Sequence, residues 1–156
     1  MKLTQYSDYG IRVLTYLGLE PRAQATVGEI ADAFDISRNH LMKVVQQLAG
    51  QGFVESRRGK QGGLRLARAP GDISIGAVIR VLENDFDLVE CMRDHRDCRI
   101  APVCRFSELV AEANQAFLAV LDNYTLDDLL CNANRRRQLF SLLNSDAESA
   151  YGTGTG

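Results

Sequence analysis

The chain has 156 residues, of which 46% are hydrophobic, with 18 Lys and Arg against 20 Asp and Glu and four Cys. This length suits one domain, or one and a half, with a real core, and the ordinary apolar fraction argues against global disorder. No run approaches the roughly 18 apolar residues of a membrane span, and the N-terminus turns polar at once, unlike a signal peptide. We therefore expect a cytoplasmic protein with no membrane partner. Its thiols are then more readily explained as metal ligands or redox groups than as members of disulfides.

The net charge of −2 conceals an uneven distribution of charge along the chain. Residues 1–70 carry ten Lys and Arg against six Asp and Glu, a net +4, whereas residues 71–156 carry eight against fourteen, a net −6. Within residues 36–70, seven cations face a single acid, Glu55. Such a basic block is typical of a nucleic-acid-binding surface, and the alternative is a solvated basic face without a partner.

The first fifty residues predict three helices. Apolar residues at three-to-four spacing predict an amphipathic helix over Thr4–Leu19, with Thr4 as its N-cap. The capping-box pattern of Thr26–Glu29 opens a short second helix. Ser37 is placed to cap a third helix, from Arg38 to about Ala49, which the glycines after it would end.

The second and third helices, joined by a short turn, have the pattern of a helix-turn-helix. This motif places its second helix in the major groove, with the side chains near the start of that helix at the base edges. Arg can pair with guanine and Asn with adenine. The predicted DNA contacts from this helix are Arg38, Asn39, His40 and Lys43. Helix pairs with short turns also occur in folds that bind no DNA.

A basic hairpin follows directly. Residues 53–56 and 64–67 are strand-like, and the Gly-rich segment between them permits a tight turn. Arg57, Arg58 and Lys60 lie at its tip. A basic hairpin after a helix-turn-helix predicts a winged helix, whose wing reaches phosphates or the minor groove. The alternative is a hairpin with ordinary solubilising charges.

Beyond a break at residues 70–71, the pattern predicts further helices. A helix is expected over residues 75–82, followed by an acidic loop over residues 83–90. The longest apolar pattern covers residues 105–122 and predicts a helix that packs on its own chain or forms a dimer seam. We favour a homodimer, because a helix-turn-helix protein usually needs two half-sites.

The end of the chain predicts a short helix capped by Thr125–Asp128, a last helical segment with a basic cluster at Arg135–Arg137, and a Gly- and Thr-rich tail. We assign the basic cluster no function. The expected fold is mainly α with a small β-hairpin. It comprises a winged helix-turn-helix over residues 1–70, a cysteine loop and dimerisation helices over residues 71–143, and a disordered tail over residues 144–156.

Three cysteines, Cys91, Cys98 and Cys104, lie within fourteen residues in a stretch without apolar periodicity, which predicts a loop. Zinc sites favour closer Cys pairs, and compact ferredoxin runs have tighter spacing. The wider spacing still suits an iron–sulfur cluster, because each thiolate meets a different iron. A redox thiol pair and structural or free thiols are the alternatives.

The sequence resembles the IscR-like winged-helix family of iron–sulfur repressors. The blocks that carry the resemblance are Met1–Tyr9 with Arg12–Leu17, Ser37–Lys43, Arg58–Leu64 and the three-Cys loop. The resemblance extends over roughly residues 1–143, and the blocks together are highly specific, although each alone is weak. The resemblance implies a homodimer, a palindromic double-stranded DNA operator, and a cluster that controls DNA affinity. Cys91, Cys98 and Cys104 would hold that cluster, with 4Fe-4S favoured over 2Fe-2S.

The fourth iron ligand is not evident from the sequence. Some members use a His three residues after the third Cys, where this chain has Ser107. That departure makes the chain most similar to the nitric-oxide-sensing members. Water, a small thiol, His95, Cys131 and a carboxylate are the candidates. The resemblance implies that the first helix of one subunit lies near the cluster loop of its partner, and we therefore predict Asp8 of the other subunit as the ligand. Tyr6 and Tyr9 suggest a partly apolar setting, in which iron would relieve the cost of an unpaired carboxylate; the alternative is an exposed early-helix acid.

The expected function is that of a cluster-dependent repressor, released from its operator when nitric oxide attacks the cluster. An iron–sulfur homeostasis regulator and a thiol-redox-sensing regulator are the alternatives, and regulators of cysteine metabolism fit less well because they lack the three-Cys loop. An electron carrier would leave the basic hairpin without a purpose. No nucleophile–base constellation, phosphate loop or paired-carboxylate site is present, so we do not expect an enzyme.

Overall fold

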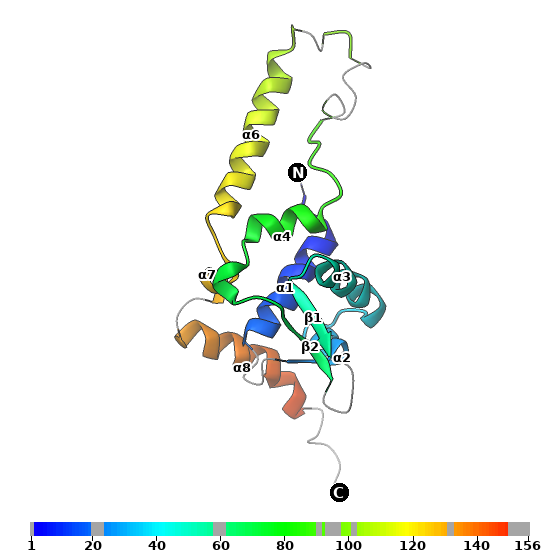
Figure 1. Ribbon diagram of the computed structural model, residues 1–156, viewed down its shortest axis with the longest axis vertical. Coiled ribbons are helices and arrows are strands. Elements are labelled where there is room, and N and C mark those ends of the chain that lie inside the picture. Colours follow the sequence, from blue (N-terminus) through cyan, green and yellow to red (C-terminus); the bar gives the residue numbers. More distant parts are fainter. Residues whose placement is uncertain are drawn as a thin grey trace, which may run out of the picture.

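The structure is a computed structural model that describes most of the chain. It covers residues 2–19, 24–57, 62–89, 92, 98–100, 103–130 and 133–149, the last stretch with side chains to residue 143. As predicted, the fold is mainly helical with one two-stranded antiparallel sheet (Figure 1). The sheet and the shorter helices form one body, from which a single long helix extends. None of the described helices has the length and apolar character that a membrane crossing requires.

Three helices build the helix-turn-helix unit. They are α1 (Gln5–Leu19), α2 (Val27–Ala33) and α3 (Arg38–Gly50), close to the predicted bounds. Their apolar faces meet in one core, in which Val13, Leu14 and Leu17 of α1 are buried with Leu41, Val44 and Leu48 of α3. The turn between α2 and α3 places Asp35 at a positive φ of 51°. The expected stop of α3 is confirmed at Gly52, whose φ of 69° suits glycine.

The wing is a hairpin of β1 (Val54–Arg57) and β2 (Gly63–Leu66). Val54 pairs with Leu66 and Arg57 with Gly63, so the register places the basic turn at the end of the ribbon. Ala25 extends the sheet by one bridge to β2, with hydrogen bonds in both directions. The tip, residues 58–61, lies outside the described residues, and with it the predicted Arg58 and Lys60.

The second half of the chain completes the same core. Its elements are a 3-10 turn (η1, Pro70–Asp72), α4 (Ile75–Leu82), α6 (Arg105–Asp122), α7 (Leu126–Leu130) and α8 (Ala133–Ser149). The core contributions from α4 and α7 include Val78, Leu82, Leu126 and Leu130, each at most 2% exposed. Helix α8 reaches Ser149 and therefore enters the segment expected to be a disordered tail; residues 150–156 lie outside the described residues.

Local capping signals predict several helix starts correctly. The capping box of Thr26 and Glu29 is present, with hydrogen bonds of 3.1 and 2.6 Å. Ser37 occupies the N-cap position of α3, but its side chain makes no capping hydrogen bond. Thr4 directly precedes α1, and its carbonyl accepts the N–H of Asp8 at 3.3 Å, while its hydroxyl donates to Glu83, the residue that follows α4.

An ion pair holds the end of α6 against α4. Arg80 donates two hydrogen bonds to Asp122, at 2.5 and 2.7 Å. The Asp122 carboxylate lies directly against Gly76 of α4, since a Cβ on Gly76 would lie 2.0 Å from it. The hydrogen bonds from Arg80 lower the pKa of Asp122 below its ordinary value.

We expect Asp122→Asn to lower the melting temperature at neutral pH and to lose this effect in acid. A carboxyl whose pKa is lowered by folding stabilises the protein above its ordinary pKa of about 3.9, and the stabilisation fades as the pH falls through the folded value. Thermal unfolding of both proteins from pH 7 to pH 3 tests this. Glu112→Gln removes an exposed charge from the same helix and is the control. A gap between wild type and Asp122→Asn that is constant with pH would contradict the prediction.

Candidate nucleic-acid interface and cysteine segment

The predicted DNA contacts on α3 are all exposed. Arg38, Asn39, His40 and Lys43 lie off the buried face formed by Leu41, Val44, Val45 and Leu48. This is the placement that major-groove readout requires, since the helix must bury one side and present the other. Met42 lies among them and is 50% exposed. The sequence reasoning missed it because it considered only polar side chains, although an apolar group can contact a thymine methyl.

The Arg38 guanidinium is already engaged within the motif. It donates two hydrogen bonds to Asp32 of α2, at 2.9 and 3.2 Å, and both side chains are more than 60% exposed. An ion pair this exposed contributes little to stability, so DNA can compete with Asp32 for the guanidinium. The ion pair therefore does not remove Arg38 from the predicted base contacts.

The cations of the wing divide into two kinds. Arg65 pairs with Glu55 across the two strands, and Arg68 lies over the ring of Phe53, 4.9 Å from its centroid. The charge of Arg65 is thus paired, whereas Arg68 is exposed and keeps its charge beside the ring. Arg57 is exposed and, like Lys43, makes no ion pair with any described residue. In the described part of the basic block, Arg57, Lys43 and Arg68 are thus exposed cations without an ion pair.

The cysteine segment is described in part. Cys98 and Cys104 are free thiols of intermediate burial, and Cys91 lies outside the described residues, as do His95 and Cys131. Among the residues that the structure describes, no three His, Cys, Asp or Glu side chains gather as metal ligands. Two partly accessible free thiols fit the donor chemistry of an iron–sulfur cluster.

Cys104 stands at the start of α6, as its N-cap residue, and makes no side-chain capping bond. A helix N-terminus favours negative charge, such as that of a thiolate-ligated cluster. The Ser107 hydroxyl donates to the backbone carbonyl of Cys104 at 2.9 Å. That hydroxyl therefore supports the turn that carries Cys104.

Asp8 lies in the first turn of α1 and points to solvent. Its side chain is 52% exposed and bonds to Arg12 at 2.8 Å, one helical turn further on. The expectation that Asp8 is unpaired in a partly apolar setting is wrong within one chain, because helical geometry turns it away from the core. The Arg12 guanidinium also lies 5.6 Å from the ring centroid of Phe34, the residue that ends α2.

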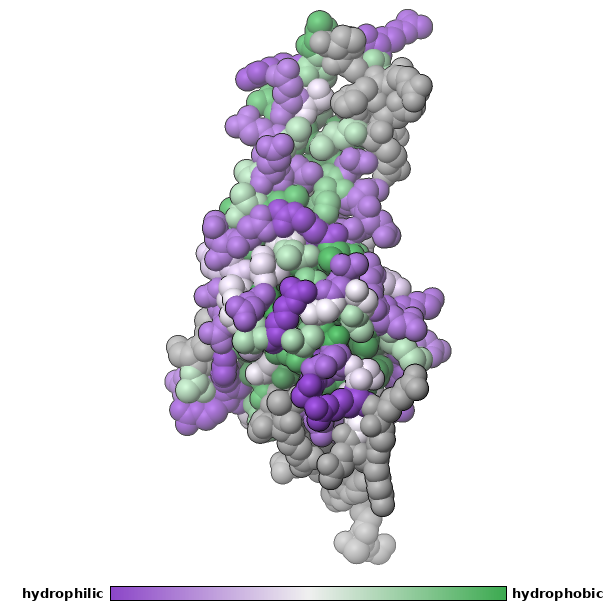
Figure 2. Space-filling model, viewed as in Figure 1, coloured by the Kyte–Doolittle hydropathy of each residue, from purple (hydrophilic) through white to green (hydrophobic). Residues whose placement is uncertain are grey.

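One side of α6 is apolar and exposed. Leu109 and Val120 are 49% and 56% exposed. With Ala113 and Ala116 they form a line at four-three-four spacing, which we call the outer seam. The opposite side packs inward, where Asn114 is the one buried residue of α6 within the described chain. Figure 2 shows hydrophobic residues exposed among the polar ones along this helix. A contiguous apolar line on an extended helix is typical of a protein–protein contact.

Comparison with known proteins places this arrangement in a family. The sequence profile of Rrf2, described as an iron-dependent transcriptional regulator, matches residues 3–132. The chain belongs to the Rrf2 family. The winged-helix interface and the cysteine segment both lie within the matched residues. The family resemblance inferred from the sequence is thereby confirmed.

Individual relatives agree with this assignment. The HTH-type transcriptional regulator NsrR of Bacillus licheniformis is 45% identical over 143 residues, covering 90% of this chain and 100% of that protein. NsrR of Bacillus subtilis is 48% identical over 134 residues, covering 85% and 92%. Since these relatives are named as transcriptional regulators, the chain is a regulator and not an enzyme, as expected.

Solved structures share the fold. The structure of CymR, the global cysteine regulator of B. subtilis, has a TM-score of 0.66 and 31% identity, covering 83% of this chain and 95% of that one. T. potens IscR has a TM-score of 0.68 and 27% identity, covering 100% and 94%. The predicted winged-helix architecture is therefore confirmed by both the observed elements and the structural neighbours.

Proposed function

We propose that the chain is an iron–sulfur repressor that binds a palindromic operator as a homodimer, in the cytoplasm, and releases it when nitric oxide attacks the cluster. The observation that carries the proposal is the trio of Cys91, Cys98 and Cys104 immediately before α6, with two of its members described as free thiols. The similarity to proteins named NsrR supports it. The fold alone does not select an effector, since similar structures include a cysteine regulator and IscR.

The three thiolates would hold the cluster, with 4Fe-4S favoured over 2Fe-2S, and Asp8 of the second subunit would be the fourth ligand. When bound, the cluster supplies the iron with which nitric oxide reacts. In Figure 1 the start of α6, which carries Cys104, stands well away from α1 of the same chain. An Asp8 ligand would therefore come from the other subunit. The outer seam of α6, defined above, is the surface that we assign to dimerisation.

Ligation by Asp8 would act on DNA binding through Arg12. This side chain bonds to Asp8 and lies over Phe34, which ends α2 at the turn before the recognition helix. If Asp8 moves to iron, Arg12 loses its partner and the packing around that turn changes. Repression requires that the cluster bind better to the DNA-competent conformation, and this route would connect the two sites.

Anaerobic purification with iron and sulfide determination tests the proposal. We expect a brown protein that binds a palindromic operator, selected from random duplexes, and loses most of that affinity on addition of nitric oxide. A colourless protein whose operator affinity follows reversible disulfide formation would instead identify a thiol-redox regulator. A brown protein that releases DNA on iron limitation but not with nitric oxide would identify a regulator of iron–sulfur homeostasis.

Asp8→Ala should retain iron but change the visible spectrum and the rate of reaction with nitric oxide. Three thiolates remain to hold the cluster, whereas the replaced ligand at one iron alters its electronic environment and access. Arg12→Ala is the matched control, because it removes the 2.8 Å ion pair while leaving the carboxylate in place. Anaerobic absorption spectroscopy and stopped-flow kinetics give the readout. An Asp8→Ala spectrum and rate identical to those of wild type would rule out ligation by Asp8.

A further inference from the structure

A single carboxylate joins the end of α4 to the start of α1. Glu83 follows the last residue of α4, and its Oε1 accepts the backbone N–H of Thr4 at 2.8 Å and the Thr4 hydroxyl at 3.1 Å. The hydroxyl of Ser7 donates to the same oxygen. Three donors from one helix start thus converge on one side chain from a residue more than seventy positions away.

These bonds satisfy groups that have no other described partner. Ser7 is 0% exposed, and a buried hydroxyl without an acceptor is unfavourable. The backbone N–H groups of a first helical turn lack partners within the helix, and an anion there interacts well with the helix dipole. Glu83 therefore holds the start of α1 from outside the helix.

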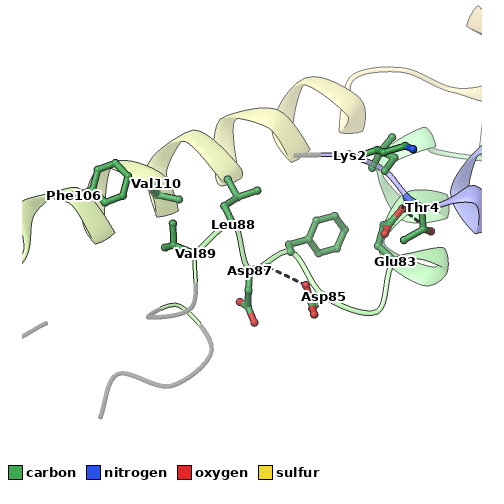
Figure 3. A pocket seen from close by; sticks show the side chains of 11 residues that line it. Lys2, Thr4, Glu83, Asp85, Asp87, Leu88, Val89, Phe106 and Val110 are labelled. Atoms are coloured by element: carbon green, nitrogen blue, oxygen red, sulfur yellow. Dashed lines mark hydrogen bonds between the residues drawn. The ribbon is translucent and has the colours of Figure 1, made fainter. Parts of the chain in front are cut away.

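Glu83 is also the first residue of the acidic segment that leads to the cysteines. Asn114 of α6 holds this segment by donating to the carbonyl of Phe86 at 3.0 Å. A cavity of about 450 Å³ lies between the segment, the start of the chain and α6 (Figure 3). Val89 lines it just before the cysteine segment, and Phe106 lines it just after Cys104. Both ends of the cysteine segment therefore border the same cavity as Thr4.

Helix α1 continues from this cavity into the DNA-binding unit. Val13, Leu14 and Leu17 are at most 3% exposed and belong to the core shared with α3. A close-packed core transmits displacement rather than absorbing it. We therefore expect a shift of the start of α1 to displace the recognition helix α3 of the same subunit.

We propose that Glu83 is a positioning residue that links the state of the cysteine segment to α1 within one subunit. With the cluster bound, the segment is held and Glu83 caps α1; when the cluster is lost, the segment moves and the cap is released. This inference rests on the proposed function and adds to it an intrachain link that involves neither Asp8 nor the second subunit. It is distinct from ligation, because Glu83 acts through Thr4 and Ser7.

Hydrogen exchange of the wild-type protein gives the first test. Amides of residues 5–9 should exchange faster after cluster removal than in the cluster-loaded protein. In Glu83→Ala they should exchange fast in both forms, since the cap is absent throughout. Glu83→Gln keeps a carbonyl oxygen that accepts the same hydrogen bonds and should restore most of the protection. Exchange at these residues that is unchanged by cluster removal would overturn the proposal.

Operator affinity gives the second test. The ratio of Kd without and with the cluster measures the coupling, typically about 5- to 150-fold. Glu83→Ala should move this ratio several-fold toward 1 by weakening the cluster-loaded form, while Glu83→Gln keeps it near the wild-type value. A purely structural role would weaken both forms alike and leave the ratio unchanged, which would refute the link.

Asp85→Ala is the matched control. Asp85 lines the same cavity and accepts the N–H of Asp87 within its own segment, at 3.3 Å. Its replacement removes a nearby negative charge and leaves the hydrogen bonds of Glu83 to Thr4 and Ser7 in place. We expect both the exchange and the Kd ratio of this variant to match wild type. Iron and sulfide content of the same samples distinguishes a failure of the proposed function from a failure of the role assigned to Glu83. A wild-type protein without a cluster refutes the proposed function, whereas a loaded protein with no response at residues 5–9 refutes only the role of Glu83.

Discussion

Replacing Cys104 by Ala is expected to yield a colourless protein that binds its operator more weakly. A site with three thiolates has no spare cysteine, and Cys104 stands at the start of α6, where no other described thiol can take its place. Visible absorption should fall to background, and the operator Kd should rise about 5- to 150-fold, the usual range of a coupling free energy. Anaerobic absorption, iron and sulfide content, and titration of labelled operator provide the measurements.

Two variants separate ligand loss from local damage. Ser107→Ala removes the 2.9 Å hydrogen bond to the Cys104 carbonyl and tests whether the turn alone matters. It should keep the cluster. Cys131→Ala should also keep it, because the sequence places Cys131 apart from the three clustered cysteines. A brown Cys104→Ala protein with full iron content, or a colourless Cys131→Ala protein, would show that the ligand set is wrong.

Local patterns in the sequence predict most of the helices. The apolar period of residues 105–122 gives both bounds of α6 correctly. Ser74 caps α4, which precedes α6, and Thr125 caps α7, which follows it, each through a bond to the residue three positions on. Such signals are readable because all the interacting groups lie within one turn of helix. The cap of α1 is not readable in this way. Its acceptor, Glu83, is brought there only by the packing of α4 against α1.

The setting of Asp8 could have been predicted more accurately. Its neighbours in sequence are aromatic, but neighbours in sequence point in different directions on a helix. Arg12 lies at the i+4 position, where an oppositely charged side chain forms an ion pair. Helical spacing therefore predicts the exposed pair that the structure shows. A ligand role for Asp8 now depends on the second subunit alone, and not on strain within its own chain.

The net charge of the basic block overstates the surface available to DNA. Of its cations, Arg38, Arg65 and Arg68 are engaged with Asp32, Glu55 and Phe53. The partners of Arg65 and Arg68 become neighbours only when the hairpin forms its register, which composition does not reveal. Asp32 lies outside the basic segment, one element earlier. Lys43 and Arg57 are the cations of the described block that have neither an acidic partner nor an aromatic one.

Asn39 and Arg57 should affect DNA binding in different ways. Asn39 is exposed near the start of α3, and a bidentate contact from Asn to adenine is worth about 1–3 kcal/mol. Asn39→Ala should therefore lower the affinity for the operator and reduce the ratio of that affinity to the affinity for unrelated duplexes. Arg57 is an exposed wing cation. Arg57→Ala should weaken all duplexes nearly equally and reduce the slope of log K against log salt by about 1 for each phosphate that the arginine neutralises. Titrations of operator and random duplex at several salt concentrations distinguish the two.

Arg57→Lys is the control for charge, because it keeps the cation and should keep the slope of log K against log salt. If Arg57→Lys loses that slope, the contact is a bidentate one that only arginine can make. The comparison also distinguishes a DNA-binding wing from a hairpin whose charges only keep the protein soluble. If the wing only solubilises the protein, Arg57→Ala leaves affinity and slope unchanged for both duplexes. If α3 lies outside the groove, Asn39→Ala leaves the preference for operator over random duplex intact. Either result would contradict the proposed DNA interface, since the exposed face of α3 and the exposed wing are its two parts.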